Sequence, residues 1–173
     1  MSELFSIRLQ NRQQQGGDGV WLDLPTTTEQ VQVALRQIGI SSDNPQGLFI
    51  SGYFAEEEKR FAISYNMVLA SNVDELNFLA SRLETLSTGE RAELNAALQA
   101  PQSELFSIGR ITDFPENVDY YVHLPDVHGP AQLGDYYLNR SGMVDMPEEW
   151  KGGIDTAQFG RYVAQQEQGV FTE

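Results

Sequence analysis

Two short apolar segments near the start of the chain, residues 4–9 and 20–24, have the length and content of β-strands. Between them lies the polar, glutamine-rich and glycine-containing segment 11–19, which is typical of a turn. The two segments therefore predict a hairpin. A further apolar run at residues 48–53 predicts a third strand.

A helical pattern follows the hairpin. Thr26 and Glu29 have the spacing of a capping box, in which a side chain at the helix start bonds the backbone three residues on. Apolar residues at helical spacing come next, and Gly39 ends the run; they are Val31, Ala34, Leu35 and Ile38. The first sixty residues thus predict a small sheet covered by one helix.

The middle of the chain predicts a helical hairpin. Ser71 and Asn72 are both candidate N-caps for a first helix, and Ser87 with Glu90 forms a capping box for a second, which Pro101 ends. The first helix carries an apolar stripe made of Val73, Leu76, Leu79, Ala80, Leu83 and Leu86. Ordinary core packing accounts for the apolar stripes of both helices.

The last region, 103–173, is expected to mix α and β structure in short elements. Apolar positions at 105–111 and 120–125 flank the acidic, turn-rich stretch 113–117. Helices are predicted at about 131–139, 147–151 and 156–165.

Charge is the strongest compositional feature, because 25 acidic residues against 11 basic ones give a formal net charge of −14. Residues 103–173 hold 12 acidic and 4 basic side chains, so −8 of the total lies there. Such a surface repels nucleic acid, which disfavours direct DNA binding, and it steers the protein toward basic grooves on other macromolecules. An acidic balance also simply favours solubility, so charge alone does not define the function.

Residue types and segments that the chain lacks argue against several classes of protein. It has no cysteine, which excludes disulfides, thiolate zinc sites and cysteine nucleophiles. No window approaches the roughly 18 apolar residues of a membrane span, and the first residues lack the pattern of a signal peptide. A soluble, cytoplasmic protein without membrane association is therefore expected.

Candidate chemistry is sparse. The sequence has no nucleophile elbow, zinc-protease motif or phosphate-binding loop. His123 and His128, with Asp126 between them, lie on a proline-broken loop, where polar residues more often form local hydrogen bonds than bind metal. No metal and no cofactor is assigned. Carboxylates are numerous, so a small hydrolase that uses a carboxylate pair stays an alternative, and it would need two carboxyl groups converging in a deep pocket.

Three groups of segments follow one another along nearly the whole chain. The first is Phe5-Ser6-Ile7 followed by 19–25, and the second is 74–83 continuing to Glu93-Leu94. The third group covers the acidic end of the chain: 117–127, 133–137, 147–149 and 154–161. In this order, the segments resemble the ArdA family of antirestriction proteins. The chain departs from the family pattern at Thr156-Ala157 and at Tyr162, which lowers the local acidity.

The resemblance implies an α+β protein built as an elongated chain of three small domains. These are an α+β domain at 1–65, a helical domain at 66–102 and an acidic α+β domain at 103–173. It also implies a homodimer shaped like bent duplex DNA, with no catalytic residue and no enzymatic activity.

The implied activity is inhibition by DNA mimicry. The expected partner is the methyltransferase core of type I restriction-modification enzymes, whose DNA-binding groove the mimic would fill. The expected partner-binding surface consists of Asp113, Glu116, Asp119, Asp126, Asp135, Asp145, Glu148, Glu149 and Asp155. An acidic module that binds another basic DNA-binding protein is the alternative.

Overall fold

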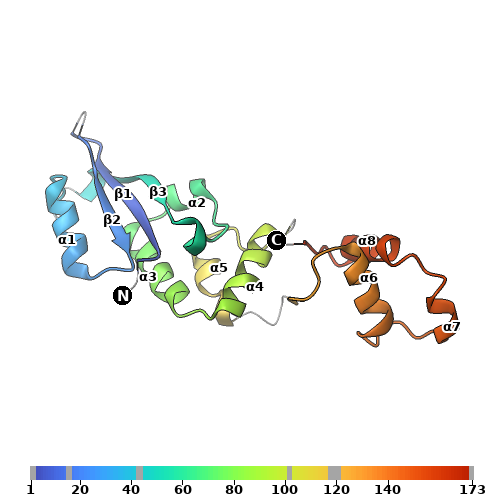
Figure 1. Cartoon of the computed structure of the whole chain (residues 1–173). Coiled ribbons are helices and arrows are strands. Elements are labelled where there is room, and N and C mark those ends of the chain that lie inside the picture. Colours follow the sequence, from blue (N-terminus) through green and yellow to red (C-terminus); the bar gives the residue numbers. More distant parts are fainter. Residues whose placement is uncertain (1–2, 15–16, 42–44, 101–102, 117–121, 172–173) are drawn as a thin grey trace. The chain divides into compact units, whose positions relative to one another are not determined.

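A computed structural model describes the chain except for residues 1–2, 15–16, 42–44, 101–102, 117–121 and 172–173. The described residues form eight α-helices and one three-stranded antiparallel sheet, so the mixed α and β content expected for the chain is confirmed (Figure 1). The chain divides into two compact units. Unit 1 comprises Met1–Leu94 with Glu104–Val118, and unit 2 comprises Asn95–Ser103 with Asp119–Glu173. The division into three domains stays a prediction.

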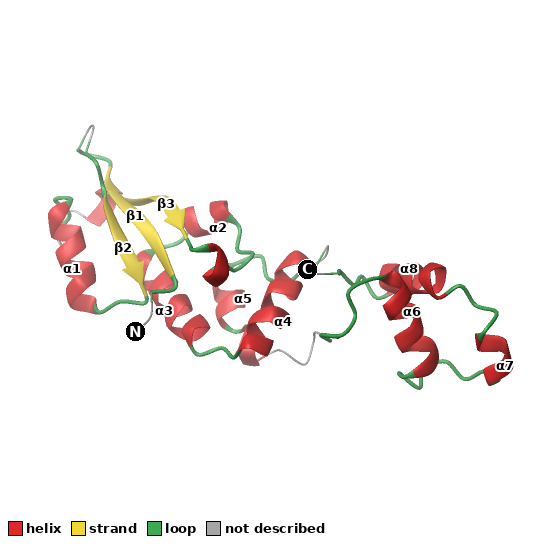
Figure 2. Ribbon diagram, viewed as in Figure 1, coloured by secondary structure: helices red, strands yellow, loops and turns green. Residues whose placement is uncertain are grey.

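The sheet of unit 1 has the strand order β2-β1-β3, shown in yellow in Figure 2. Strand β1 (Phe5–Asn11) pairs with β2 (Val20–Leu24) and with β3 (Leu48–Phe54), which confirms the predicted hairpin and the third strand. Every second side chain of β1 is buried, from Phe5 to Asn11. This alternation gives the sheet one face in the core and one face turned outward.

Helix α1 (Thr28–Gln37) begins one residue later than its sequence signature suggests. The predicted capping box placed Thr26 at the helix start, but Thr27 is the N-cap, and its hydroxyl accepts a hydrogen bond from the backbone N–H of Gln30. The backbone of Thr26 is instead bound by the side-chain amide of Asn77. The amide oxygen accepts from the N–H of Thr26 at 2.7 Å, and the amide nitrogen donates to the carbonyl of Thr26 at 3.0 Å. This tertiary contact keeps Thr26 out of the helix and ties α3 to the connection between β2 and α1.

The predicted helical hairpin is confirmed as α3 (Val73–Glu84) and α4 (Thr88–Gln99). Asn72 caps α3 by accepting from the backbone N–H of Glu75 at 2.8 Å. Ser87 and Glu90 form the reciprocal capping box of α4. The short helix α2 (Tyr65–Leu69) precedes α3, and two 3-10 turns, η1 (Pro45–Gly47) and η2 (Glu57–Lys59), flank β3.

Mixed α and β structure was expected for residues 103–173, but the described part of this region contains helices and no strand. Its first apolar segment contributes to α5 (Ile108–Thr112), and the acidic, turn-rich stretch that follows contains the 3-10 turn η3 (Phe114–Glu116). The physical reason is the spacing of three between its buried residues, which places them on one helical face; they are Leu105, Ile108, Ile111 and Phe114. Helix α5 packs on α3 within unit 1. Of the second expected apolar segment, 120 and 121 lie outside the described residues.

Unit 2 is built on two crossing helices, α6 (Pro130–Asn139) and α8 (Thr156–Gln166), with the short α7 (Glu148–Lys151) in the connection between them. All three helices were predicted. Gly134 and Gly160 lie where α6 and α8 cross, and a Cβ added at Gly134 would overlap the carbonyl oxygen of Thr156. A Cβ at Gly160 would overlap the carbonyl oxygen of Pro130. The two helix backbones thus approach each other closely because neither glycine has a side chain.

This crossing predicts that Gly134→Ala destabilises unit 2. The added methyl group meets backbone atoms that cannot rotate away, so we expect a loss of about 1–3 kcal/mol. Amide hydrogen exchange in α6 and α8 measures this loss, and about 5- to 150-fold faster exchange is expected if it proceeds through opening of the unit. Gly152→Ala is the matched control, because Gly152 has αR backbone angles and no atom lies near its Cβ position. Equal exchange rates in the two variants would contradict the close crossing.

Candidate acidic interaction surface

The nine predicted surface carboxylates do not all fall in the same unit. Asp113 follows the last residue of α5 and Glu116 lies in η3, so both belong to unit 1. Asp119 lies outside the described residues. The other six belong to unit 2: Asp126, Asp135, Asp145, Glu148, Glu149 and Asp155. Their combination into one continuous face stays a prediction.

Glu116, Glu148 and Asp135 each have a cationic partner among the described residues. Glu116 pairs with Arg82 at 2.9 Å, and Glu148 with Lys151 at 2.6 Å. Asp135 pairs with Arg140 at 2.9 Å and also accepts from the side-chain amide of Asn139. Since surface ion pairs add little stability, their main consequence is to neutralise part of the local charge.

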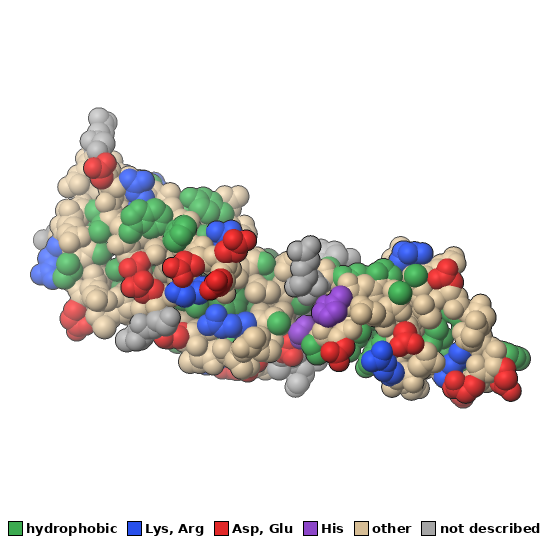
Figure 3. Space-filling model, viewed as in Figure 1, with side chains coloured by type: hydrophobic (Ala, Val, Ile, Leu, Met, Phe, Trp, Pro, Cys, Tyr) green, Lys and Arg blue, Asp and Glu red, His purple; other side chains and the backbone are tan. Residues whose placement is uncertain are grey.

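Other carboxylates of unit 2 have no ion pair within the described part of the chain. Asp126, Asp145 and Glu149 are exposed, and none of them forms an ion pair with a described residue. Asp155 is also exposed; it caps α8 by accepting from the backbone N–H of Gln158 at 2.9 Å. In Figure 3, acidic side chains gather where unit 2 carries α7. These residues give unit 2 an outward negative field.

Sequence reasoning selected the carboxylates but missed the cations that neutralise some of them. Lys151 follows Glu148 by three residues within one helix, and this spacing brings two side chains to the same face. That signal was available in the sequence. The pair of Asp135 with Arg140 was less predictable, because Arg140 lies at the end of α6, where the backbone leaves helical geometry.

The two histidines do not form a metal centre with the described residues. His123 is half-buried and His128 exposed, and the backbone N–H of His128 donates to the side chain of Gln132 at 2.8 Å. Across the described part of the chain, no three histidine or carboxylate side chains gather in a way that could hold a metal ion.

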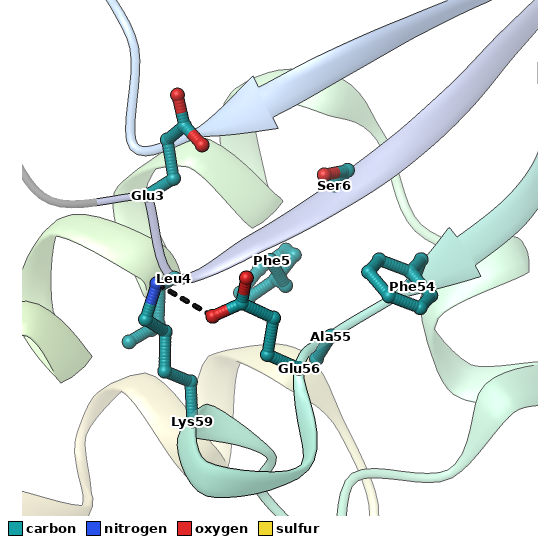
Figure 4. Close-up of a pocket in the computed structure, with 8 residues that line it drawn as sticks. All are labelled: Glu3, Leu4, Phe5, Ser6, Phe54, Ala55, Glu56 and Lys59. Atoms are coloured by element: carbon teal, nitrogen blue, oxygen red, sulfur yellow. Dashed lines mark ion pairs between the residues drawn. The ribbon is translucent and has the colours of Figure 1, made fainter.

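One pocket of unit 1, of about 90 Å³, lies beside the ends of β1 and β3 (Figure 4). Glu3 and Glu56 line it, but the Glu56 carboxylate is paired with the Lys59 ammonium at 2.9 Å, and Glu3 points away from both. Pockets that enclose a small-molecule ligand usually measure about 300 Å³ or more. This pocket therefore lacks the depth and the converging carboxyl groups that a hydrolase would need.

The fold and the charges together define an acidic protein of mixed α and β structure whose candidate site is an exposed surface. The sequence model of the family described as Antirestriction protein (ArdA) matches residues 17–173, and the chain belongs to this family. The resemblance seen in the sequence is thereby confirmed. No curated protein matches the chain. Membership implies an antirestriction function and interaction with restriction-modification enzymes. Within the described ranges, no helix is long and apolar enough to cross a membrane.

Asp135 provides a test of the charge state of this surface. Hydrogen bonds from Arg140 and then from Asn139 hold the pKa of its carboxyl below the ordinary value of 3.8. The folded state therefore binds this proton less readily than the unfolded chain does. The resulting stabilisation is present above about pH 3.8 and is lost as the pH falls through the lowered folded pKa.

We accordingly expect Asp135→Asn to lower the free energy of unfolding at pH 6 but to cost less at pH 3. Urea unfolding at the two pH values measures the difference between wild type and variant. Asp145→Asn removes the same charge from a side chain outside any described ion pair, and so controls for net charge. A cost for Asp135→Asn that does not shrink on acidification would refute the pairing.

Proposed function

We propose that this chain inhibits type I restriction-modification enzymes by mimicking DNA. Its acidic surface occupies the DNA-binding groove of the methyltransferase core, so that the enzyme no longer binds its target. Family membership supports the antirestriction part of the proposal, and the excess of exposed carboxylates supports the mimicry. The proposed surface comprises the nine predicted carboxylates, and the proposed compartment is the cytoplasm.

The observation that carries the proposal is the imbalance of charge in residues 119–173, where nine acidic residues face three basic ones. Two of those three cations, Arg140 and Lys151, are already paired with carboxylates of the same unit. Exposed carboxylates such as Asp126, Asp145 and Glu149 are therefore available to bind cations of a partner. A groove shaped to bind phosphates offers cations to such a surface, and this complementarity speeds encounter and fixes orientation.

The amount of charge is sufficient for a DNA-binding groove. Duplex DNA carries one negative charge per about 1.7 Å of helix axis. A homodimer, which is part of the proposal, would carry twice the net charge of −14, equivalent to about 48 Å or roughly 14 base pairs of phosphate charge. The inhibitor therefore needs no catalytic step, because competition for the groove prevents both recognition and cleavage of DNA.

The direct test is displacement of labelled target DNA from a purified type I methyltransferase by increasing amounts of the protein. Wild type should displace DNA at micromolar concentration and low salt. The triple variant Asp126→Asn, Asp145→Asn and Glu149→Gln should be weaker by about tenfold, because three exposed charge pairs at about 0.5 kcal/mol each contribute roughly 1.5 kcal/mol.

A control variant with the same loss of charge shows whether binding depends on the carboxylates of unit 2 or only on the net charge of the chain. Asp18→Asn, Glu57→Gln and Glu58→Gln remove three exposed carboxylates from residues 1–65 instead. This control should displace DNA nearly as well as wild type. An equal loss in both variants would mean that net charge alone governs binding. Failure of wild type to displace DNA would refute the proposed function.

A further inference from the structure

Trp150 is an exposed tryptophan in a helix that contributes no buried residue. It belongs to α7, where every side chain is at least partly exposed, and Trp150 itself is 68% exposed. The core of unit 2 lies elsewhere, around Leu133, Leu138 and Val163 on α6 and α8. Since tryptophans are highly buried on average, a largely exposed indole in an otherwise polar segment points to contact with another molecule.

The face of the Trp150 indole is also free of the cations that cover other rings of this protein. Arg12, Arg91 and Arg110 stack on phenylalanine rings, the last at 4.5 Å from the centroid of Phe106. Among the described residues, no arginine or lysine stacks on Trp150. The neighbouring Lys151 has a side chain only 15% exposed, and its ammonium is bound to Glu148. The indole therefore remains available for a cation from outside.

The surroundings of Trp150 attract positive charge. Residues 145–155 contain four carboxylates, at Asp145, Glu148, Glu149 and Asp155, and one basic residue, Lys151. Figure 3 shows hydrophobic and acidic side chains next to each other at the end of unit 2 that carries α7. Tryptophan is the aromatic residue that binds cations best through its ring face, and neighbouring carboxylates increase the local concentration of such cations.

We propose that Trp150 anchors the acidic surface on its partner by receiving an arginine or lysine side chain of the DNA-binding groove on its indole face. Glu149, adjacent in the chain and exposed, pairs with the same cation or its neighbour. The inference rests on the proposed function and adds a contact that DNA phosphates cannot make.

Charge complementarity selects a basic protein groove as the occupant. A symmetric contact of two copies at this patch would bring the carboxylates around Trp150 in one copy against the same carboxylates in the other, so like charges would meet. A stacked aromatic also adds affinity without adding charge. This matters because carboxylates spread over a protein surface are sparser than phosphates on DNA, and packing then has to supply part of the binding energy.

The test uses the full chain in the DNA-displacement titration with the type I methyltransferase. Trp150→Ala should weaken displacement about 10- to 100-fold, as expected for an aromatic anchor. Trp150→Phe keeps a ring and should recover most of the loss, whereas Trp150→Gln should not. Tyr162→Ala removes another exposed aromatic of unit 2, 59% exposed, and should displace DNA like wild type.

Each outcome separates the inference from the proposed function. If wild type displaces DNA and Trp150→Ala and Trp150→Gln do so equally well, the anchor is refuted and the function stands. If wild type fails to displace DNA, both are refuted. Thermal unfolding checks that the variants are folded. If sedimentation shows that Trp150→Ala and Trp150→Gln convert a wild-type dimer to monomer, Trp150 belongs to a contact between two copies and the anchor is refuted.

Discussion

Repulsion among 25 acidic side chains, opposed by only 11 basic ones, is the constraint under which this chain folds. Unpaired backbone N–H groups at helix N-termini stabilise negative charge without a counterion. The structure uses this repeatedly: acidic residues occupy the first turn or N-cap of five helices, at Glu29, Asp74, Glu75, Glu90, Glu148, Glu149 and Asp155. Seven of the 25 acidic side chains are thereby stabilised locally, which helps to make an acidic surface compatible with a packed core.

Within unit 2, the core and the acidic surface lie in different segments of the chain. The core depends on the close approach of α6 and α8 at Gly134 and Gly160, which buries side chains over a short stretch of each helix. The long connection between these helices, including α7, is then free to carry carboxylates and an exposed indole. The residues that form the core of unit 2 are therefore different from those that form its exposed acidic surface. A substitution on α7 need not disturb the packing of α6 against α8.

Local patterns were sufficient to predict most elements of this fold. Periodicity located the three strands and the helices around 73–84 and 130–139, and the capping box at Ser87 marked a helix start correctly. A tertiary contact decided a case that failed. Asn77, 51 residues away, fixes Thr26 outside α1, so the helix begins after Thr27 and not at the capping box that the sequence indicated.

The candidate site could be predicted only as a set of carboxylates. Their charge follows from composition, and the spacing of Glu148 and Lys151 within one helix indicates that ion pair. The pairing of Asp135 with Arg140 depends on how the backbone turns at the end of α6, which the sequence pattern does not give. The exposure of Trp150 could not be predicted from the sequence either, because tryptophan side chains are highly buried on average.

DNA mimicry requires the protein to occupy the groove in which the restriction-modification enzyme binds DNA. Hydrogen exchange of a purified type I methyltransferase, measured with this protein and separately with target DNA, tests it most directly. DNA mimicry predicts that both ligands protect the same peptides of the groove, because both fill it. Protection confined to a surface that DNA does not touch, with the groove still exchanging freely, would contradict mimicry and indicate inhibition from a remote site.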